Sequence, residues 1–147
     1  RGELALHGRI AITRAYGLFA GGNSRGSSAW AGHARDSADF LSLVPCMAAT
    51  PGETDAAVHL RLTIDAMDLL HTGHADIFGL ISSNAALAPL VCRLREGGRM
   101  VHVFGDTFTP RGLISACDAF CNTDELARLA TEGGNRDAYA ESEPAEV

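Results

Sequence analysis

Two polar turns directly follow apolar stretches of the sequence, and their side chains are of types that hold phosphates or close turns by hydrogen bonds. Ser82, Ser83 and Asn84 follow one such stretch, and Asp106 follows the next. In parallel sheets, ligands sit outside the carboxyl ends of the strands, which makes both turns candidates for a site. For Ser82 and Ser83, hydrogen bonding to the N–H groups of the next helix is favoured over phosphate binding at that helix start.

The elements around these turns alternate between strand and helix. Residues 77–81 and 99–105 are short apolar stretches typical of buried strands, and residues 85–96 between them have a helical pattern. Pro89 falls in the first turn of that helix, where proline is tolerated, and Gly97 follows its last residue. The segment is therefore predicted to be a strand–helix–strand unit with parallel strands and a right-handed crossover.

Elements with weaker patterns complete an α/β fold, predicted to be a three-layer sandwich around a mainly parallel central sheet. The remaining predicted elements are strands at 9–16 and 41–49, the second weakened by Pro45, and helices at 29–40, 55–71, 110–120 and 124–132. Thr109 is expected to cap the helix that Pro110 opens. One domain is therefore predicted over residues 1–132, followed by an acidic tail at 133–147 that we expect to be disordered.

The composition of the 147-residue chain is that of a soluble globular protein, with 46% apolar and 20% charged residues. No apolar run approaches the length of a membrane span, and no signal peptide is visible, so we expect a cytoplasmic protein. The net charge of −6 argues against strong non-specific binding of nucleic acid through its phosphates. It does not argue against a metal-dependent nuclease, whose site is itself acidic.

The cysteines and two of the histidines are weaker candidates for a metal or catalytic site. Cys117 and Cys121 are four residues apart, but no second ligand pair supports a zinc site, and reduced cysteines packed in the core are favoured. His71 and His74 stand at a predicted helix end, where histidines commonly cap carbonyl groups. No spacing of Ser, Cys, His and Asp residues supports a nucleophile arrangement.

An ordered set of motifs resembles the NYN domains of the LabA-like group, which are related to PIN nucleases. The motifs are IDAMDLL at 64–70, SSNAALAPLVCRLREGG at 82–98, VFGDTFTP at 103–110 and ACDAF at 116–120. The resemblance is collinear from about Gly8 to Asn122. It implies a PIN-like, Rossmann-like fold and a ribonuclease that uses Mg²⁺ or Mn²⁺ held by carboxylates at the carboxyl ends of the strands.

The residues that the resemblance places at the metal centre are not carboxylates in this chain. Where the family's strand-end turn reads SSDSDF, this sequence has Asn84 and Ala86 in place of the two aspartates. Where the family's long helix opens with a KNAADI-like run, the Asp falls on His59 and the Lys on Asp55. The family's fourth Asp lies on a first strand before Gly8, and we expect that strand to be missing from this chain.

A partly rebuilt site is the alternative. Asn84 can offer one carbonyl oxygen to a metal, and the imidazole of His59 suits zinc or manganese better than magnesium. Asp55 lies one helical turn before His59 and faces the same way. Asp106 and Asp118 remain near the ends of strands or helices, with Asp118 weighed evenly between a framework role and the rim of the site.

Three functional hypotheses follow. In the first, the chain is a catalytically impaired NYN domain, without a metal, that binds RNA or a protein, and His59 and Asn84 mark the degenerate catalytic positions. In the second, it is an active Mg- or Mn-dependent ribonuclease whose site is rebuilt or completed from outside the chain. In the third, it is a fragment without function, whose missing first strand leaves a central sheet position open and predicts poor solubility or a strand-swapped dimer. Asp65 and Asp68 are assigned to the framework helix, and no membrane partner is expected.

Overall fold

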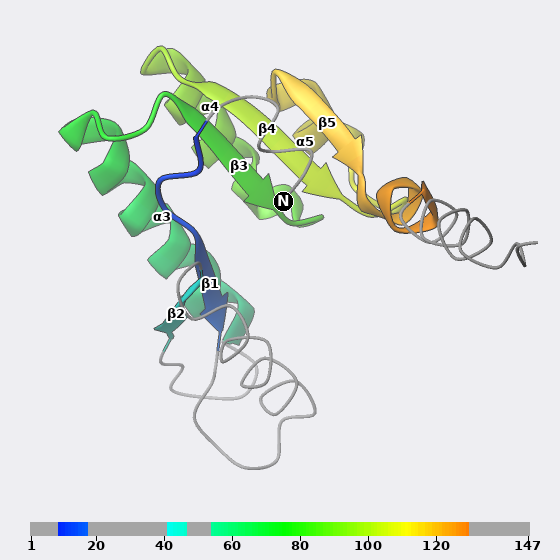
Figure 1. Cartoon of the computed structure of the whole chain (residues 1–147), viewed down its shortest axis with the longest axis horizontal. Helices are drawn as coiled ribbons and strands as arrows, with labels where there is room; N and C mark the ends of the chain where they lie inside the picture. Colours follow the sequence, from blue (N-terminus) through cyan, green and yellow to red (C-terminus); the bar gives the residue numbers. More distant parts are fainter. Residues whose placement is uncertain (1–8, 18–40, 47–53, 130–147) are drawn as a thin grey trace, which may run out of the picture. The chain divides into compact units, whose positions relative to one another are not determined.

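The computed structural model describes residues 9–17, 41–46 and 54–129 and divides the chain into two compact units, Arg1–Asp76 and Ile77–Val147. Each unit has a parallel sheet and at least one helix (Figure 1). The predicted helix at 29–40, the expected loss of a strand before Gly8 and the predicted tail at 133–147 lie outside the described residues. None of the described helices has the length and apolar character that crossing a membrane requires.

The first unit contains two short parallel strands, β1 (Arg14–Gly17) and β2 (Ser42–Pro45). Both are shorter than the stretches predicted at 9–16 and 41–49. The backbone N–H groups of Ser42 and Cys46 donate to carbonyl oxygens of the first strand segment, at 2.9 Å each. Because the donors that face β1 are spaced two residues apart, Pro45 falls on a position whose missing N–H the pair does not need.

A long helix, α3 (Thr54–Thr72), follows in the same unit and matches the helix predicted at 55–71. It ends at Gly73, whose φ of 68° is accessible to glycine at little cost. Nδ1 of His71 lies 2.7 Å from the carbonyl oxygen of Met67, a contact in which the ring nitrogen must donate. The expectation that His71 caps a carbonyl at the helix end is therefore confirmed.

The second unit contains a three-stranded parallel sheet in the order β3-β4-β5. The strands are β3 (Ile77–Ile81), β4 (Met100–Gly105) and β5 (Ala119–Asn122). Between β3 and β4 lie a short 3-10 turn, η2 (Ala85–Leu87), and the helix α4 (Ala88–Glu96), with Pro89 in its first turn. The predicted strand–helix–strand unit with parallel strands is therefore confirmed. The helix α5 (Arg111–Ala116) precedes β5, and residues 123–129 form a further helix.

The prediction of one helix over 110–120 is wrong in its second half, because α5 ends at Ala116 and the chain then joins the sheet as β5. The backbone N–H of Asp118 donates to the carbonyl oxygen of Val101, and the Asp118 carboxylate accepts from the N–H of Val101 in return. These bonds fix β5 beside β4. Thr109 does not cap α5 either, since its hydroxyl bonds elsewhere and the helix start has no side-chain cap.

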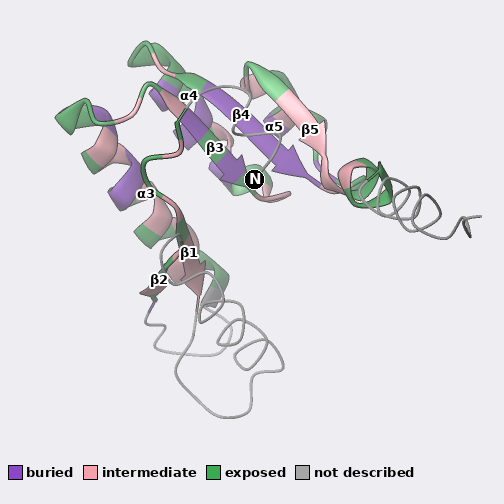
Figure 2. Ribbon diagram, in the orientation of Figure 1, coloured by how far each residue is buried: buried purple, intermediate pink, exposed green. Residues whose placement is uncertain are grey.

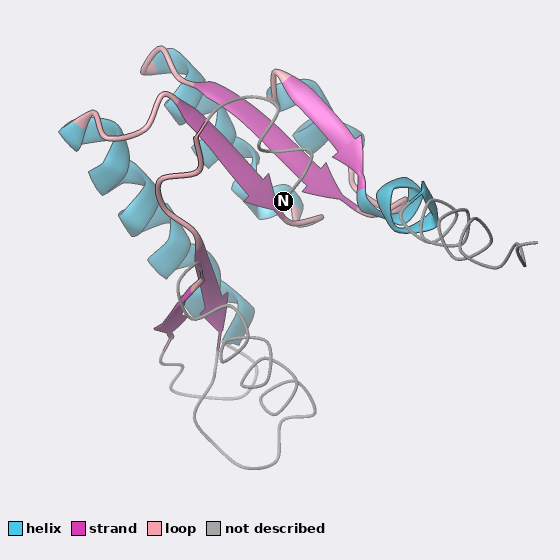
Figure 3. Cartoon of the chain, viewed as in Figure 1, coloured by secondary structure: helices cyan, strands magenta, loops and turns pink. Residues whose placement is uncertain are grey.

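The core of the second unit lies between the sheet and the helices α4 and α5. Figure 2 shows the buried residues concentrated on the central strand and on the helices, and Figure 3 shows α4 and α5 behind the three strands. The largest fully buried side chains are Leu87, Val91, Leu94, Val101, Val103 and Leu113. All are aliphatic, so burial of apolar surface holds the turns after β3 and β4 in place.

Candidate functional site at the carboxyl ends of the strands

The turn after β3 is closed by its own side chains. The N–H of Ser82 continues the sheet pairing by donating to the carbonyl oxygen of Phe104 at 2.9 Å. The hydroxyl oxygen of Ser82 accepts from the N–H of Asn84 at 3.2 Å. The side-chain oxygen of Asn84 in turn accepts from the N–H of Ala86 at 2.8 Å, which makes Asn84 the N-cap of η2. The contacts of Ser82 and Asn84 close the turn, which favours a structural role for these two side chains over ligand binding.

Ser83 joins the two turns that the sequence placed at this edge. Its hydroxyl oxygen accepts from the backbone N–H of Asp106 at 2.9 Å and is hydrogen-bonded to the Thr109 hydroxyl at 3.0 Å. The Thr109 hydroxyl also lies 2.8 Å from the carbonyl oxygen of Asp106. Gly105 makes this closeness possible, because a Cβ built on it would lie 2.2 Å from Oγ1 of Thr109. The two turns, which the sequence offered separately as candidates, are thus in direct contact at the carboxyl ends of β3 and β4.

The carboxylates near this edge already bind backbone groups. One oxygen of Asp106 accepts from the N–H of Phe108 at 2.9 Å. Asp124, which the sequence analysis did not single out, accepts from the N–H and hydroxyl of Thr107 at 3.1 and 2.7 Å. The Thr107 hydroxyl, followed by its N–H, lowers the pKa of Asp124 below the ordinary value. The signal for Asp124 was available in the run Asn122–Asp124, three turn-forming residue types after an apolar stretch.

Asp118 is not part of this edge. It precedes β5 and lies beside Val101 near the start of β4, at the amino ends of the strands. One of its oxygens accepts from the N–H of Val101 and the other from Nε of Arg95, both at 2.8 Å. The Val101 N–H first, and then the Arg95 charge, lower the pKa of Asp118. The structure therefore separates Asp118 from Asn84 and Asp106 by the length of the strands, and its contacts are those of a framework residue.

His59 and Asp55 lie on α3, in the first unit. Asp55 is exposed in the first turn of the helix, where a negative charge is favoured by the helix dipole. His59 follows one turn later and is partly buried. The two residues thus share one face of α3, as their spacing predicted.

The described residues do not fit a carboxylate-held Mg²⁺ or Mn²⁺. Such a centre needs several charged oxygens that converge on one point. No group of three or more His, Cys, Asp or Glu side chains that could hold a metal occurs among residues 9–17, 41–46 and 54–129. At the predicted position, Asn84 contributes a neutral oxygen that already caps η2, and Ala86 contributes a methyl group.

All four cysteines are free thiols, and Cys46 is buried while Cys92 is exposed.

One large aromatic side chain projects from the same edge of the sheet. Phe108, in the loop after β4, is 89% exposed, which is the largest exposure among the large apolar side chains in the described part of the chain. Its own N–H is fixed by Asp106, and the loop is fixed by Asp124 through Thr107. The loop therefore presents an aromatic face from a backbone that hydrogen bonds hold in place. The composition of the loop gave no sign of this exposure in advance.

Comparison with known proteins identifies the family and supports the fold. The sequence pattern of the NYN domain family matches residues 1–124. A crystal structure of a protein of unknown function, VPA0982 from Vibrio parahaemolyticus RIMD 2210633, is similar with a TM-score of 0.59 and 22% sequence identity. The likeness covers 74% of this chain and 66% of that chain. It supports the α/β fold with parallel strands. No curated protein matches the sequence.

Proposed function

The chain belongs to the NYN domain family, whose members are generally nucleases, and from this premise we propose that it binds single-stranded RNA without cleaving it. The observation that carries the proposal is the turn after β3. Where the resemblance places two aspartates, this turn has Asn84, whose oxygen caps η2, and Ala86, which has no ligand atom. A nuclease of this type needs the negative charge of those aspartates to hold its metal.

The absence of negative charge at Asn84 and Ala86 supports the absence of cleavage. Asp106 and Asp124 keep carboxylates at the same edge, but each has an oxygen bound to the loop that it orders. These hydrogen bonds to Thr107 and Phe108 leave each carboxylate one oxygen for any other contact. The imidazole of His59, on α3, adds no negative charge.

Stacking on Phe108 supports RNA binding. An exposed aromatic ring on a fixed loop can stack against a base, a contact that depends little on sequence. The net charge of −6 opposes binding through phosphates alone. We therefore expect weak binding to single-stranded RNA, with stacking as its main favourable contribution.

The test measures binding and cleavage on the same samples. Fluorescently labelled single-stranded RNA is incubated with the purified protein in Mn²⁺ or in a chelator, and anisotropy and gel analysis follow. We expect no cleavage beyond the chelator control, and equal binding with and without metal. The substitution Phe108→Ala should weaken binding by about 1–3 kcal/mol. Met100→Ala, an exposed apolar side chain at the amino end of β4, is the matched control and should leave binding unchanged.

Restoration of the charges gives a second test. Asn84→Asp combined with Ala86→Asp should fold normally, because aspartate also caps helix starts. We expect this double variant to remain without cleavage activity, because His59 still stands where the family has a carboxylate. Mn²⁺-dependent cleavage by the unmodified protein would refute the proposal in favour of an active ribonuclease. Cleavage by the double variant alone would show that His59 does not limit activity.

A further inference from the structure

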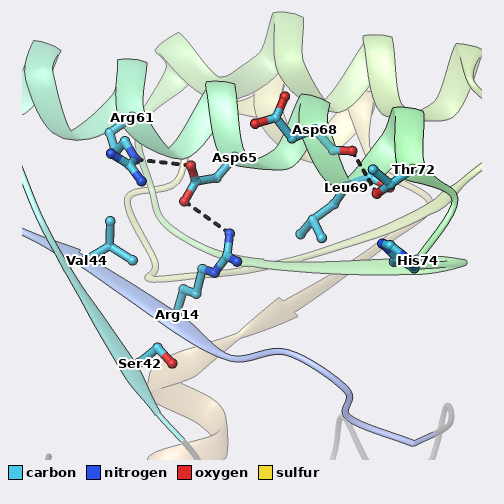
Figure 4. A pocket seen from close by; sticks show the side chains of 9 residues that line it. All are labelled: Arg14, Ser42, Val44, Arg61, Asp65, Asp68, Leu69, Thr72 and His74. Carbon is cyan, nitrogen blue, oxygen red and sulfur yellow. Dashed lines mark hydrogen bonds and ion pairs between the residues drawn. The ribbon is translucent and has the colours of Figure 1, made fainter.

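A pocket of about 500 Å³ lies in the first unit, between α3 and the two strands β1 and β2 (Figure 4). It takes no part in the site proposed above. Its lining combines charged, hydroxyl and apolar side chains. The lining residues are Arg14, Ser42, Val44, Arg61, Asp65, Asp68, Leu69, Thr72 and His74.

An arginine–aspartate–arginine cluster forms one wall of the pocket. Oδ2 of Asp65 accepts from Nη1 of Arg14 at 3.1 Å, and Oδ1 accepts from Nε of Arg61 at 3.0 Å. Figure 4 shows the two guanidinium groups reaching the carboxylate from opposite sides, one from β1 and one from α3. The hydroxyl of Tyr16 donates to Oδ2 as well, and burial, as the largest cause, raises the pKa of Tyr16. Asp65 thereby accepts hydrogen bonds from three side chains, those of Arg14, Tyr16 and Arg61.

The cluster has a net charge of +1, because two guanidinium groups surround one carboxylate. Asp65 is 7% exposed, and one arginine would suffice to neutralise it. The side chains of Arg14 and Arg61 are 33% and 52% exposed. The bond to Asp65 engages Nε of Arg61, and among the described residues the two terminal nitrogens of that guanidinium have no hydrogen-bond partner and can donate to a second acceptor. Figure 4 shows the carboxylate of Asp68 pointing away from Arg14. Because Asp68 lines the same pocket, it offsets part of the positive charge.

We propose that this pocket binds the phosphate group of a nucleotide, with Arg61 and Arg14 as the phosphate ligands. Guanidinium groups bind phosphate through paired, charge-assisted hydrogen bonds, and Asp65 holds both of them in place for that contact. The hydroxyls of Ser42 and Thr72 and the apolar side chains of Val44 and Leu69 line the remaining space. This mixture suits a sugar and a base better than a bare inorganic ion.

The alternative is that the cluster only fastens α3 to β1, with no ligand. The two roles are separated by Arg61→Gln, which removes the charge of a half-exposed side chain and leaves Arg14 to neutralise Asp65. The matched control is Arg93→Gln on α4. The Arg93 side chain has nearly the same exposure, 51%, and also pairs with a carboxylate, that of Glu96, at 3.8 Å.

Calorimetric titration of the whole chain with inorganic phosphate, uridine monophosphate and uridine tests the proposal. We expect the monophosphate to bind more tightly than phosphate, and uridine to bind weakest. Arg61→Gln should weaken binding of the monophosphate about tenfold or more, the equivalent of one charge-assisted hydrogen bond. Arg61→Lys keeps the charge but not the paired donors, so its affinity for the monophosphate should lie between those of Arg61→Gln and the unmodified protein. Arg93→Gln should bind the monophosphate as the unmodified protein does.

Two results would overturn the proposal. One is equal binding of the monophosphate by Arg61→Gln and the unmodified protein. The other is the absence of phosphate and monophosphate binding at millimolar concentration, together with RNA binding that Arg61→Gln does not change. RNA binding that is lost in Arg61→Gln, without monophosphate binding, would support the pocket and assign its phosphate to an RNA chain. Because Phe108→Ala tests RNA stacking separately, failure of either proposal can be told from failure of the other.

Discussion

Replacing Gly105 with alanine tests whether the contact between the two turns holds the carboxyl edge of the sheet together. An added Cβ would lie 2.2 Å from Oγ1 of Thr109 and 3.2 Å from both Oγ of Ser83 and a ring carbon of Phe120. The first of these distances is far inside van der Waals contact, so Thr109 must move. Its short, β-branched side chain moves away by turning its hydroxyl from the Ser83 hydroxyl in the other turn and from the carbonyl oxygen of Asp106.

The cost of Gly105→Ala has two parts. Overpacking of a buried site costs about 1–3 kcal/mol, and the lost hydrogen bond of Thr109 adds about 1 kcal/mol. We therefore expect the free energy of unfolding to fall by about 2–4 kcal/mol. Thr109→Ala alone should cost about 1–2 kcal/mol. When Gly105→Ala and Thr109→Ala are combined, the two losses of stability should not add, because Thr109→Ala removes the Oγ1 atom that the new Cβ would meet. The total loss should be about 1–2 kcal/mol smaller than the sum of the two single losses.

Urea unfolding followed by circular dichroism measures these differences, provided that the dependence on urea stays the same among the variants. Gly112→Ala is the control, because nothing lies within 4 Å of a Cβ built on Gly112 in α5. That substitution should leave stability unchanged or raise it slightly, since alanine favours helix more than glycine does. Unchanged stability of Gly105→Ala, or strict additivity in the double variant, would refute the contact between the turns.

Two further substitutions address the amino edge of the same sheet. Asp118→Ala should lower the free energy of unfolding by about 1 kcal/mol at neutral pH, through loss of the bonds to Val101 and Arg95. Because the folded protein lowers the pKa of Asp118, the difference should be complete above the ordinary aspartate pKa of about 3.9. It should disappear as acid protonates the carboxylate, and a difference independent of pH in urea unfolding would contradict this account. Gly98→Ala should cost about 1 kcal/mol, because φ of 77° disfavours alanine; an unchanged unfolding midpoint would contradict it.

Elements with a strong local pattern could be predicted from the sequence. The helix α3 and the strands β3 and β4 lie within a residue of the predicted bounds. Each is rich in apolar residues and ends beside a residue type with a known conformational preference, such as Gly73. The strand β5 could not be predicted, because its apolar residues continue the helical spacing of α5 and only pairing with β4 decides between the two.

The candidate site divides in the same way. The sequence alone determined that the turn after β3 has no carboxylate at positions 84 and 86, because Asn84 and Ala86 have no charge whatever surrounds them. Only the tertiary structure decided that Ser83 joins this turn to Asp106, and that Asp118 lies at the opposite edge.

The pocket of the first unit depends even more on the tertiary structure. Arg14 and Asp65 are 51 residues apart, and no local pattern relates them. The sequence assigned Asp65 to a framework helix, which its contacts support. That Asp65 also brings two guanidinium groups to one pocket follows from the placement of β1 along α3, because contacts between distant segments depend on how whole elements pack.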